Sequence, residues 1–529
     1  MGITAPPAET AWLLHNALGF AAQAEADTAA ILEEAARMAE GVLAPLDRPG
    51  DMAGARWHDG TVTVPEGFAE AHRAFAGSGW IGLAADEEQG GQGLPMALGL
   101  AAHEMFTSAN FAFGLCPMLT QDAIHLLQAH GSPDQRARFL PRLIGGDWTG
   151  TMCLTEPQSG SDLSGIRTRA APDGEGGWRI SGQKIFITFG EHGMTGNILH
   201  MVLARLPDAP PGSAGISLFA VPRCRADGSP NGVRCVSIEK KLGIHASPTC
   251  TMAFEDAAGE LVGPPHQGLV CMFAMMNAAR LGVAMQGVAV AERAFRRALA
   301  YAEDRAQGGG PIVEHPDVRR MLLTMRALAL GGRLLTLYAS LAEETRAALL
   351  IPVAKAWCTD AGVEAASLGV QVHGGAGFVE ETGAAQHLRD ARIAPIYEGT
   401  NGIQALTLLR RGLRRDQGAA CAALLAEIAD DPDTGPALAH AAQLAAEGAT
   451  WLRQAGAREA EAGATPFLHL LGTVTAGWLC SRVADRADAP SGARVAATVF
   501  IEQVLPRVHF LAHALATPSA ALVGRQPIQ

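Results

Sequence analysis

The feature that most constrains the fold is the order in which two kinds of sequence follow one another. Residues 10–145 repeat apolar side chains three to four apart, the period of an amphipathic helix. Residues 149–261 are instead rich in glycine, proline and short β-branched runs, which is typical of strands and turns. From residue 269 the helical period returns and continues. Because helices and strands do not alternate, a doubly wound parallel sheet is excluded and a mainly α chain with a central β domain is predicted.

The central segment contains enough short strands for a small sheet or barrel. Residues 178–181 and 184–188 flank Gly182-Gln183, which predicts a β-hairpin. Four more strands are predicted, over residues 198–204, 215–221, 233–238 and 250–254. Strands at this spacing indicate an antiparallel sheet or barrel.

The length of 529 residues, 48% of them hydrophobic, is enough for several domains with a large core. The changes in sequence character predict four: an N-terminal helical domain, a β domain, a helical domain and a further helical domain rich in alanine and leucine. Their expected bounds are 1–148, 149–268, 269–415 and 416–529.

Charge and cysteine content limit the partners and the compartment. A net charge of −12 argues against a nucleic-acid backbone as the main partner. The nine cysteines are scattered without a CxxC pair, which favours a reducing compartment. No arginine or lysine precedes Arg37, which argues against a signal or transit peptide, and no apolar run approaches about 20 residues. We therefore expect a cytoplasmic protein with no membrane span and no metal site.

Two segments of the β region carry candidate chemistry. In residues 152–162, Thr155, Ser159 and Ser161 supply hydroxyls that can bond a ring carbonyl or a pyrophosphate. The alternative is a polar loop in which Asp162 caps a helix. In residues 184–190, an aromatic side chain and a hydroxyl two positions apart share one face of a strand and could hold a flat cofactor. The alternative is the core-facing side of that strand.

Two further segments lie in the second helical region. In residues 371–378, three glycines within four positions would let backbone approach a ligand closely, and the alternative is a plain turn. In residues 389–404, Glu398 precedes a glycine just before a predicted helix. A carboxylate in an apolar pocket has a raised pKa, as a general base requires. The alternative is a negative charge placed for the helix dipole.

In this order and at these separations, the four segments resemble the acyl-CoA dehydrogenase family. The resemblance covers residues 12–413 and rests on Cys-Leu-Thr-Glu-Pro…Gly-Ser-Asp, Gly-x-Lys-x-Phe-Ile-Thr, Gly-Gly-x-Gly-Phe and Tyr-Glu-Gly-Thr. It implies an N-terminal helical domain, a small β barrel and a C-terminal four-helix bundle, with FAD between the last two. The similar branch has an extra C-terminal helical domain and includes 3-(methylthio)propanoyl-CoA and broad-range fatty acyl-CoA dehydrogenases.

The resemblance also implies roles for individual residues. Contacts with FAD are implied for Leu154, Thr155, Ser161, Phe186, Thr188, Arg305, Gln371, Gly374, Gly375, Thr400 and Asn401. Of these, Arg305 and the loop of Gln371, Gly374 and Gly375 would reach the FAD of a neighbouring subunit. Substrate contacts are implied for Ser161, Arg280, Tyr397 and Arg410.

Glu398 is implied as the catalytic base. Some members carry the carboxylate just before the arginine that matches Arg280, and here that position is Ala279. The implied reaction removes the α-proton of an acyl-CoA with Glu398 while hydride leaves the β-carbon for FAD, which gives the 2-enoyl-CoA. The chain departs from the family pattern after Arg305 and is shorter than the similar branch near Ala342. A short or medium acyl-CoA or a thioether acid is expected.

Two other functions stay open: an acyl-CoA oxidase that uses oxygen, and a non-catalytic flavoprotein homologue that binds nucleic acid. Relatives of the second kind carry a basic C-terminal domain, whereas residues after 416 mix both signs of charge. The resemblance further implies fatty acid metabolism, an electron-transfer flavoprotein as the acceptor, and a homodimer.

Overall fold

The computed structural model describes residues 2–517 and 520–524, and its described residues form two compact units. The first unit consists of Met38–Gly99 and Ala109–Ala279. The second consists of Met1–Arg37, Leu100–Ser108 and Arg280–Gln529.

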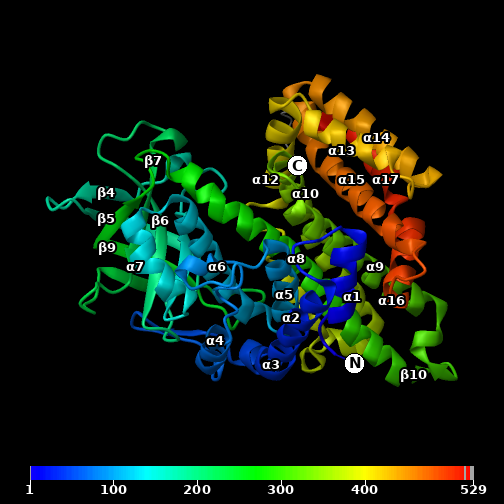
Figure 1. Cartoon of the computed structure of the whole chain (residues 1–529), viewed down its shortest axis with the longest axis horizontal. Helices are drawn as coiled ribbons and strands as arrows, with labels where there is room; N and C mark the ends of the chain where they lie inside the picture. The colour runs from blue at the N-terminus through cyan, green and yellow to red at the C-terminus, as the bar shows by residue number, and fades with distance from the viewer. Residues whose placement is uncertain (1, 518–519, 525–529) are drawn as a thin grey trace. The chain divides into compact units, whose positions relative to one another are not determined.

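The first unit contains the sheet, which closes into a small barrel (Figure 1). Its strands are β3 (Trp148–Cys153), β4 (Arg169–Pro172), β5 (Trp178–Thr188), β6 (Asn197–Arg205), β7 (Ile216–Pro222), β8 (Val233–Ile238) and β9 (Thr249–Val262). β6 pairs with β4, β4 with β5, β5 with β9, β9 with β7, and β7 with β6 again. The predicted barrel is therefore confirmed, and its interior is filled by buried side chains such as Ile180, Phe219 and Met252.

Two details of the predicted sheet are wrong. β3 and β4 run parallel to β6, so the sheet is mixed rather than antiparallel. The segments after β3 and β4 are long enough for the crossover that a parallel pair needs. Gly182 does not turn a hairpin either, because β5 is one continuous strand along β9. A Cβ at Gly182 would lie 2.8 Å from Thr168 Cα, so glycine serves a close approach here.

Helices cover the sheet in the first unit. α6 (Phe111–His130) and α7 (Pro133–Ile144) lie beside it in Figure 1. Gly150 of β3 lets α6 approach, since a Cβ there would lie 2.5 Å from Ala123 Cβ. α7 begins with a capping box in which Ser132 and Gln135 satisfy each other's backbone N–H groups.

The second unit is built on long helices. They are α8 (Gly268–Asp304, from Arg280 onward), α9 (Pro316–Leu341), α10 (Glu344–His373), α11 (Ala384–Ala391) and α12 (Asn401–Thr407). α8 and α10 cross at glycines: a Cβ on Gly287 would lie 2.3 Å from the Cys358 carbonyl oxygen, and one on Gly362 would lie 2.6 Å from that of Gly287. This crossing places the start of α8 in this unit beside the middle of α10.

The segments after Arg305 and near Ala342, where the chain departs from the pattern of the similar branch, are both compact. A hairpin of β10 (Ala306–Gln307) and β11 (Gly310–Pro311) turns on Gly308 and Gly309, which both have positive φ. Between α9 and α10 only residues 342–343 remain, and the Glu343 carboxylate caps α10 by accepting from two backbone N–H groups.

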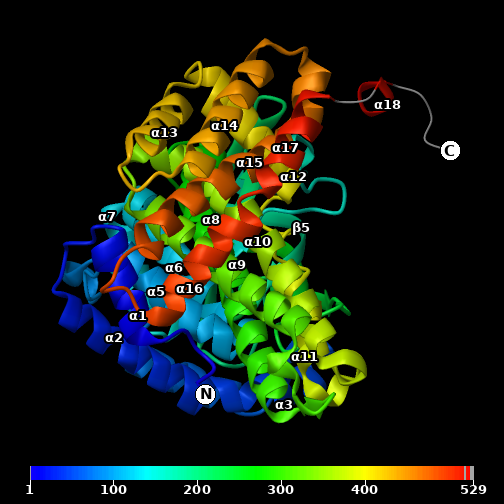
Figure 2. The ribbon, with the colours of Figure 1, turned by 90° about the vertical axis from the view of Figure 1, so that its right-hand side faces the viewer.

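The last part of the chain is helical, as predicted, and packs on α9 and α10 (Figure 2). It contains α13 (Ala419–Asp430), α14 (Pro436–Gln454), α15 (Ala457–Ala484), α16 (Ser491–Val499) and α17 (Arg507–Ala516).

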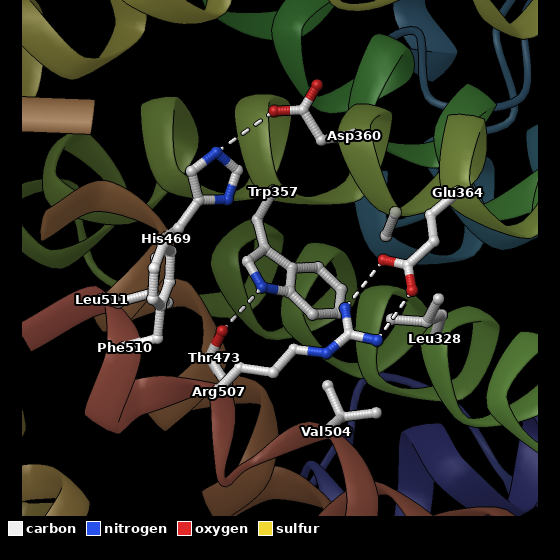
Figure 3. A pocket seen from close by; sticks show the side chains of 11 residues that line it. Leu328, Trp357, Asp360, Glu364, His469, Thr473, Val504, Arg507, Phe510 and Leu511 are labelled. Atoms are coloured by element: carbon white, nitrogen blue, oxygen red, sulfur yellow. Dashed lines mark hydrogen bonds and ion pairs between the residues drawn. The ribbon is translucent and has the colours of Figure 1, made fainter. Parts of the chain in front are cut away.

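Polar pairs fasten α15 and α17 to α10 around a cavity of about 380 Å³ (Figure 3). Trp357 Nε1 donates to Thr473 Oγ1 at 3.0 Å. The His469 ring and the Asp360 carboxylate lie 3.1 Å apart, and the Arg507 guanidinium holds Glu364 with two bonds of 2.7 Å. The indole of Trp357 lies between these pairs in Figure 3.

A buried cluster of charges joins helices that are far apart in sequence. Arg333 of α9 is fully buried and contacts Glu104 of α5 (Met96–Ala109) and Glu292 of α8, the latter at 2.9 Å. Arg326 contacts Glu292 at 2.8 Å and also Glu9 of α1 (Pro7–Trp12). The arginines lower the pKa of Glu292 despite its burial. Arg296 Nε also lies 2.7 Å from Glu292, so three arginines face the three glutamates of this interior cluster.

Two helical stretches of the described chain, Gly268–Asp304 and Ser491–Ala516, are long and apolar enough to cross a membrane by length and composition. In the first, 61% of the most apolar window is buried inside the protein, which is typical of a core helix. No group of three or more metal-binding side chains gathers anywhere in residues 2–517 and 520–524.

Candidate active site

Glu398 lies in a tight loop between α11 and α12. Glu398 and Gly399 both have left-handed backbones, with φ of 55° and 86°. The loop closes when the Asn401 N–H donates to the Pro395 carbonyl at 3.0 Å, and Thr400 caps α12. A non-glycine residue with positive φ is uncommon and needs support from its surroundings.

Three side chains supply that support from other elements. Lys355 Nζ of α10 donates to the Gly399 carbonyl at 2.9 Å. Gln404 Nε2 of α12 donates to the carbonyls of Glu398 and Gly399 at 3.2 and 3.1 Å. Arg280 Nε of α8 lies 3.5 Å from the Glu398 carbonyl. Every carbonyl of the left-handed pair is therefore bonded.

The electrostatics of this loop favour a proton acceptor. Burial raises the pKa of Glu398, while Arg280 and Lys355 act in the opposite direction. Burial also lowers the pKa of Lys355 to about 7, and burial together with Glu398 raises that of Tyr397. A carboxylate with a raised pKa near two cations can be ionised at neutral pH and still bind a proton well.

The surroundings of Tyr397 were not evident from the sequence. Its hydroxyl contacts Oε1 of Gln286 of α8, and the Gln286 side chain is fully buried.

The backbone N–H of Glu398 meets no acceptor within residues 2–517 and 520–524. The loop thus combines a carboxylate and a free N–H donor at one residue. Ala279, just before Arg280 on α8, is buried and carries no carboxylate.

The first unit holds the segment of Leu154 and Thr155 in place with a buried ion pair. Lys184 Nζ of β5 lies 2.9 Å from both Glu156 Oε1 and the Leu154 carbonyl oxygen. Glu156 also accepts from Thr168 Oγ1 at 2.6 Å, and its pKa falls to about 2, with burial opposed by Lys184 and these hydrogen bonds. The ion pair is therefore structural.

The same ion pair sets the path of β5. The register of β5 against β9 shifts between Lys184 and Ile187, so both of these side chains point inward. Phe186 has φ of 60° and its side chain is 59% exposed. Phe186 and Thr188 thus lie off the core-facing side, which argues against the alternative that they fill the barrel. The Ile185 N–H donates to the Thr155 carbonyl, so the two segments adjoin.

The hydroxyls of Ser159 and Ser161 have different surroundings: Ser159 is buried and donates to the Asp162 carbonyl, whereas Ser161 lies on the surface. Asp162 caps the short 3₁₀ turn Leu163–Gly165 by accepting from the Ser164 N–H at 2.9 Å. The capping alternative is therefore correct for Asp162, and it leaves Ser161 accessible.

The glycine-rich loop is open to solvent. Gln371, Gly374 and Gly375 are exposed, and a Cβ added to either glycine would meet nothing within 4 Å. Arg305 is exposed as well. Below the loop, the His373 and Tyr301 rings stack at 4.4 Å.

These residues suit FAD by their chemistry. The first unit offers an exposed aromatic ring beside the partly exposed hydroxyls of Thr155 and Thr188. The second unit offers an open glycine backbone and an exposed arginine, which suit phosphate and adenosine groups. The Asn401 side chain is already bonded to Lys355, Ala356 and Thr359, so a contact with FAD would fall to its backbone.

Arg410 lies on the surface. Its side chain is 63% exposed and pairs with Glu461 of α15 at 3.0 Å. The next residue, Arg411, interacts electrostatically with Arg280 instead. Lys355, Gln404 and Gln286 were also missed by the sequence analysis, because a lone polar residue in an apolar helix carries no mark of what it faces.

Comparisons with known proteins identify the family of this chain. Three family models match consecutive parts of the chain: the acyl-CoA dehydrogenase N-terminal domain at residues 25–147, the middle domain at 151–257 and the C-terminal domain at 266–413. This chain belongs to the acyl-CoA dehydrogenase family. The family is FAD-dependent. A fourth model, "acetyl-CoA dehydrogenase C-terminal like", matches residues 418–524.

Several proteins are similar to this acyl-CoA dehydrogenase over most of its length. It is 46% identical to 3-methylmercaptopropionyl-CoA dehydrogenase of Ruegeria pomeroyi, with 90% of each chain covered. It is 34% identical to broad-specificity linear acyl-CoA dehydrogenase FadE5 of Mycobacterium tuberculosis over 78% of this chain and 74% of that one. The structure of Caenorhabditis elegans ACDH-11 in complex with C11-CoA shares the fold, with a TM-score of 0.82 at 20% identity over 96% and 92% of the two chains.

Proposed function

We propose that this acyl-CoA dehydrogenase converts an acyl-CoA thioester to the 2-enoyl-CoA, with Glu398 as the base that removes the α-proton. The observation that carries the proposal is the loop itself. It holds a carboxylate of raised pKa on a left-handed backbone whose N–H is unbonded within the described chain. A base needs both accessibility to the substrate and a pKa near the working pH.

The residues of the loop perform the proton chemistry. Glu398 in its ionised form accepts the α-proton, and Arg280 and Lys355 keep that form populated at neutral pH. The N–H of Glu398 donates to the thioester oxygen, which becomes more negative as the proton leaves. FAD, when bound, supplies the acceptor for the hydride that leaves the β-carbon.

Contacts with FAD and CoA are proposed for residues of each unit taken separately. For FAD we propose Leu154, Thr155, Ser161, Phe186, Thr188, Arg305, Gln371, Gly374, Gly375, Thr400 and the backbone of Asn401. For the acyl-CoA we propose Ser161, Arg280 and Tyr397, with Arg410 at the outer end. The exposure of Phe186 and of the glycine-rich loop supports this assignment.

We propose a short thioether acyl-CoA, 3-methylmercaptopropionyl-CoA, as the substrate. The support is the 46% identity to a 3-methylmercaptopropionyl-CoA dehydrogenase over 90% of both chains. A straight-chain acyl-CoA is the second candidate, supported by the lower identity to the broad-specificity linear acyl-CoA dehydrogenase. We further propose an electron-transfer flavoprotein as acceptor, a cytoplasmic location and a homodimer.

The test is anaerobic reduction of the purified, FAD-loaded enzyme. A panel of 3-methylmercaptopropionyl-, butyryl- and octanoyl-CoA should bleach the flavin absorbance, fastest with the thioether. Glu398→Gln should slow bleaching by at least about 10²-fold, the range for loss of a general base. Glu381→Gln is the control. It replaces an exposed glutamate in the segment before α11, and this variant should bleach normally. Bleaching at the full rate by Glu398→Gln would refute the assignment of the base.

Reoxidation separates the dehydrogenase from the oxidase. A dehydrogenase that uses an electron-transfer flavoprotein should stay reduced for many turnover times in air when product is bound. Rapid reoxidation by oxygen alone would favour the oxidase.

A further inference from the structure

Lys355 is a buried cation to which the proposed reaction gives so far only an electrostatic role, the stabilisation of ionised Glu398. It lies in the middle of α10 and its side chain is completely buried. A lysine is almost never fully buried unless it is paired. Its ammonium donates hydrogen bonds to the Gly399 carbonyl at 2.9 Å and to Asn401 Oδ1 at 3.0 Å. Both acceptors lie within three residues of the base.

The lysine acts on a backbone that needs to be held. Glu398 and Gly399 are consecutive left-handed residues, and Glu398 has a Cβ that this conformation crowds. The carbonyl of Gly399 receives Lys355 from one side and Gln404 from α12 from another. Without these donors the peptide after Glu398 could rotate, and the carboxylate would move with it.

Asn401 links the lysine to the rest of α10. Its side-chain amide donates to the Ala356 carbonyl at 3.2 Å and to Thr359 Oγ1 at 3.1 Å, while its oxygen accepts from Lys355. The start of α12 is thereby fixed to one face of α10. Gln404 is fully buried, and its Oε1 has no partner within residues 2–517 and 520–524. Its orientation is set by the two carbonyls to which its NH₂ group donates.

We propose that Lys355 and Gln404 are positioning residues that hold the Glu398 loop in its left-handed, reaction-ready conformation. Lys355 also acts electrostatically, because its positive charge lies near Glu398. The other charges that act on Lys355 are Asp360 on the same helix and Arg280 on α8. Gln404 is neutral and contributes position alone. This inference rests on the proposed role of Glu398 and deepens it.

Two variants separate the two contributions. Lys355→Met keeps the aliphatic stem and removes both the donor and the charge. Gln404→Leu removes donors without changing charge. Lys355→Arg restores a charged donor, and Arg319→Met removes an exposed cation from α9 as the control. Each is made in the full chain, loaded with FAD, and studied by stopped-flow reduction with the best acyl-CoA of the panel.

Lys355→Met should lower the limiting rate of flavin reduction by about 10–100-fold, the cost of a base displaced by about 1 Å. The concentration of acyl-CoA that gives half-saturation should change by less than about threefold, because the Lys355 ammonium is bonded to the loop itself. The acid limb of the rate against pH should move to higher pH, since Glu398 loses a nearby positive charge. Lys355→Arg should recover part of the rate and the original acid limb.

Gln404→Leu should lower the limiting rate and leave the acid limb in place. If Lys355→Met does not retain FAD, this variant and Lys355→Arg carry the test. Normal reduction rates and acid limbs in Lys355→Met and Gln404→Leu would overturn the inference, as would an equal loss in Arg319→Met. Failure of the wild type to be reduced, or a normal rate in Glu398→Gln, would instead overturn the proposed function.

Discussion

The Lys355 ammonium lies 2.9 Å from the carbonyl oxygen of Gly399, the residue that follows the left-handed Glu398. An interior lysine is thus committed to the backbone of the loop that carries the base. Its position has consequences for stability as well as for the reaction, because an ammonium taken out of water is costly.

The stability of the wild type relative to Lys355→Met should rise with pH. Burial lowers the pKa of Lys355 to about 7, from the 10.5 of a free lysine. Between these values the unfolded chain binds more protons than the folded one, so stability increases with pH through this window. Below pH of about 7 the unfavourable contribution is complete. Thermal unfolding of both proteins from pH 6 to 10 measures it, and a constant difference in Tm would contradict it.

The rate of proton abstraction should fall as the solution is made more acidic, and this fall should occur at a pH above the ordinary pKa of a glutamate. Burial raises the pKa of Glu398 above the 4.5 of a free glutamate, and the base works only when ionised. The limiting rate of flavin reduction should therefore decline as pH falls through that raised pKa. Rapid reduction measured from pH of about 4 to about 9 checks this. An acid limb at or below pH of about 4.5 would show that Glu398 is not the titrating base.

Removing Arg333 should unfold the second unit at much milder conditions. Arg333→Met leaves Glu104 and Glu292 buried without one of their cations, and breaking such a cluster costs about 3–5 kcal/mol. Arg320→Met is the matched control, since Arg320 makes an exposed pair with Asp317 worth less than about 1 kcal/mol. Urea unfolding compares them, and equal midpoints would contradict the role of the cluster.

The contribution of that cluster to the free energy of unfolding should decrease as pH falls. The arginines hold the pKa of Glu292 below its ordinary value, so its contribution is present above the unfolded pKa of about 4.5 and is lost as pH falls towards the folded pKa. The gap in stability between wild type and Arg333→Met should narrow over this acid range.

Gly472→Ala should loosen the last helices from the bundle. A Cβ on Gly472 of α15 would lie 2.7 Å from Trp357 Cδ1, and overpacking of this kind costs about 1–3 kcal/mol. In an exposed helix the same change would stabilise by up to about 1 kcal/mol. Gly41→Ala is that control, because its added Cβ meets nothing within 4 Å. A lower Tm for Gly472→Ala alone is expected, and a higher one would contradict the packing.

The order of helical and β regions and the small barrel could be predicted from the sequence, because both leave local periods. The Glu398 segment could be singled out because it carries a local motif, and its role as the site of the base stays a prediction. Prediction from the sequence failed at Gly182, where glycine allows a close approach to Thr168 and the turn signal is therefore misleading. It missed the bulge in β5, since a register shift depends on the partner strand. It also missed Lys355, whose acceptor on Gly399 lies 44 residues further along the chain. Burial depth and distant partners leave no local pattern.

The contact between Glu9 and Arg326 joins residues 317 positions apart. During synthesis, α1 leaves the ribosome long before α9 exists, so the carboxylate of Glu9 has no cation to meet until most of the chain has been made. This contact of α1 can therefore form only after Arg326 has been made, so a tag or truncation at the N-terminus acts on a contact that is completed late in synthesis.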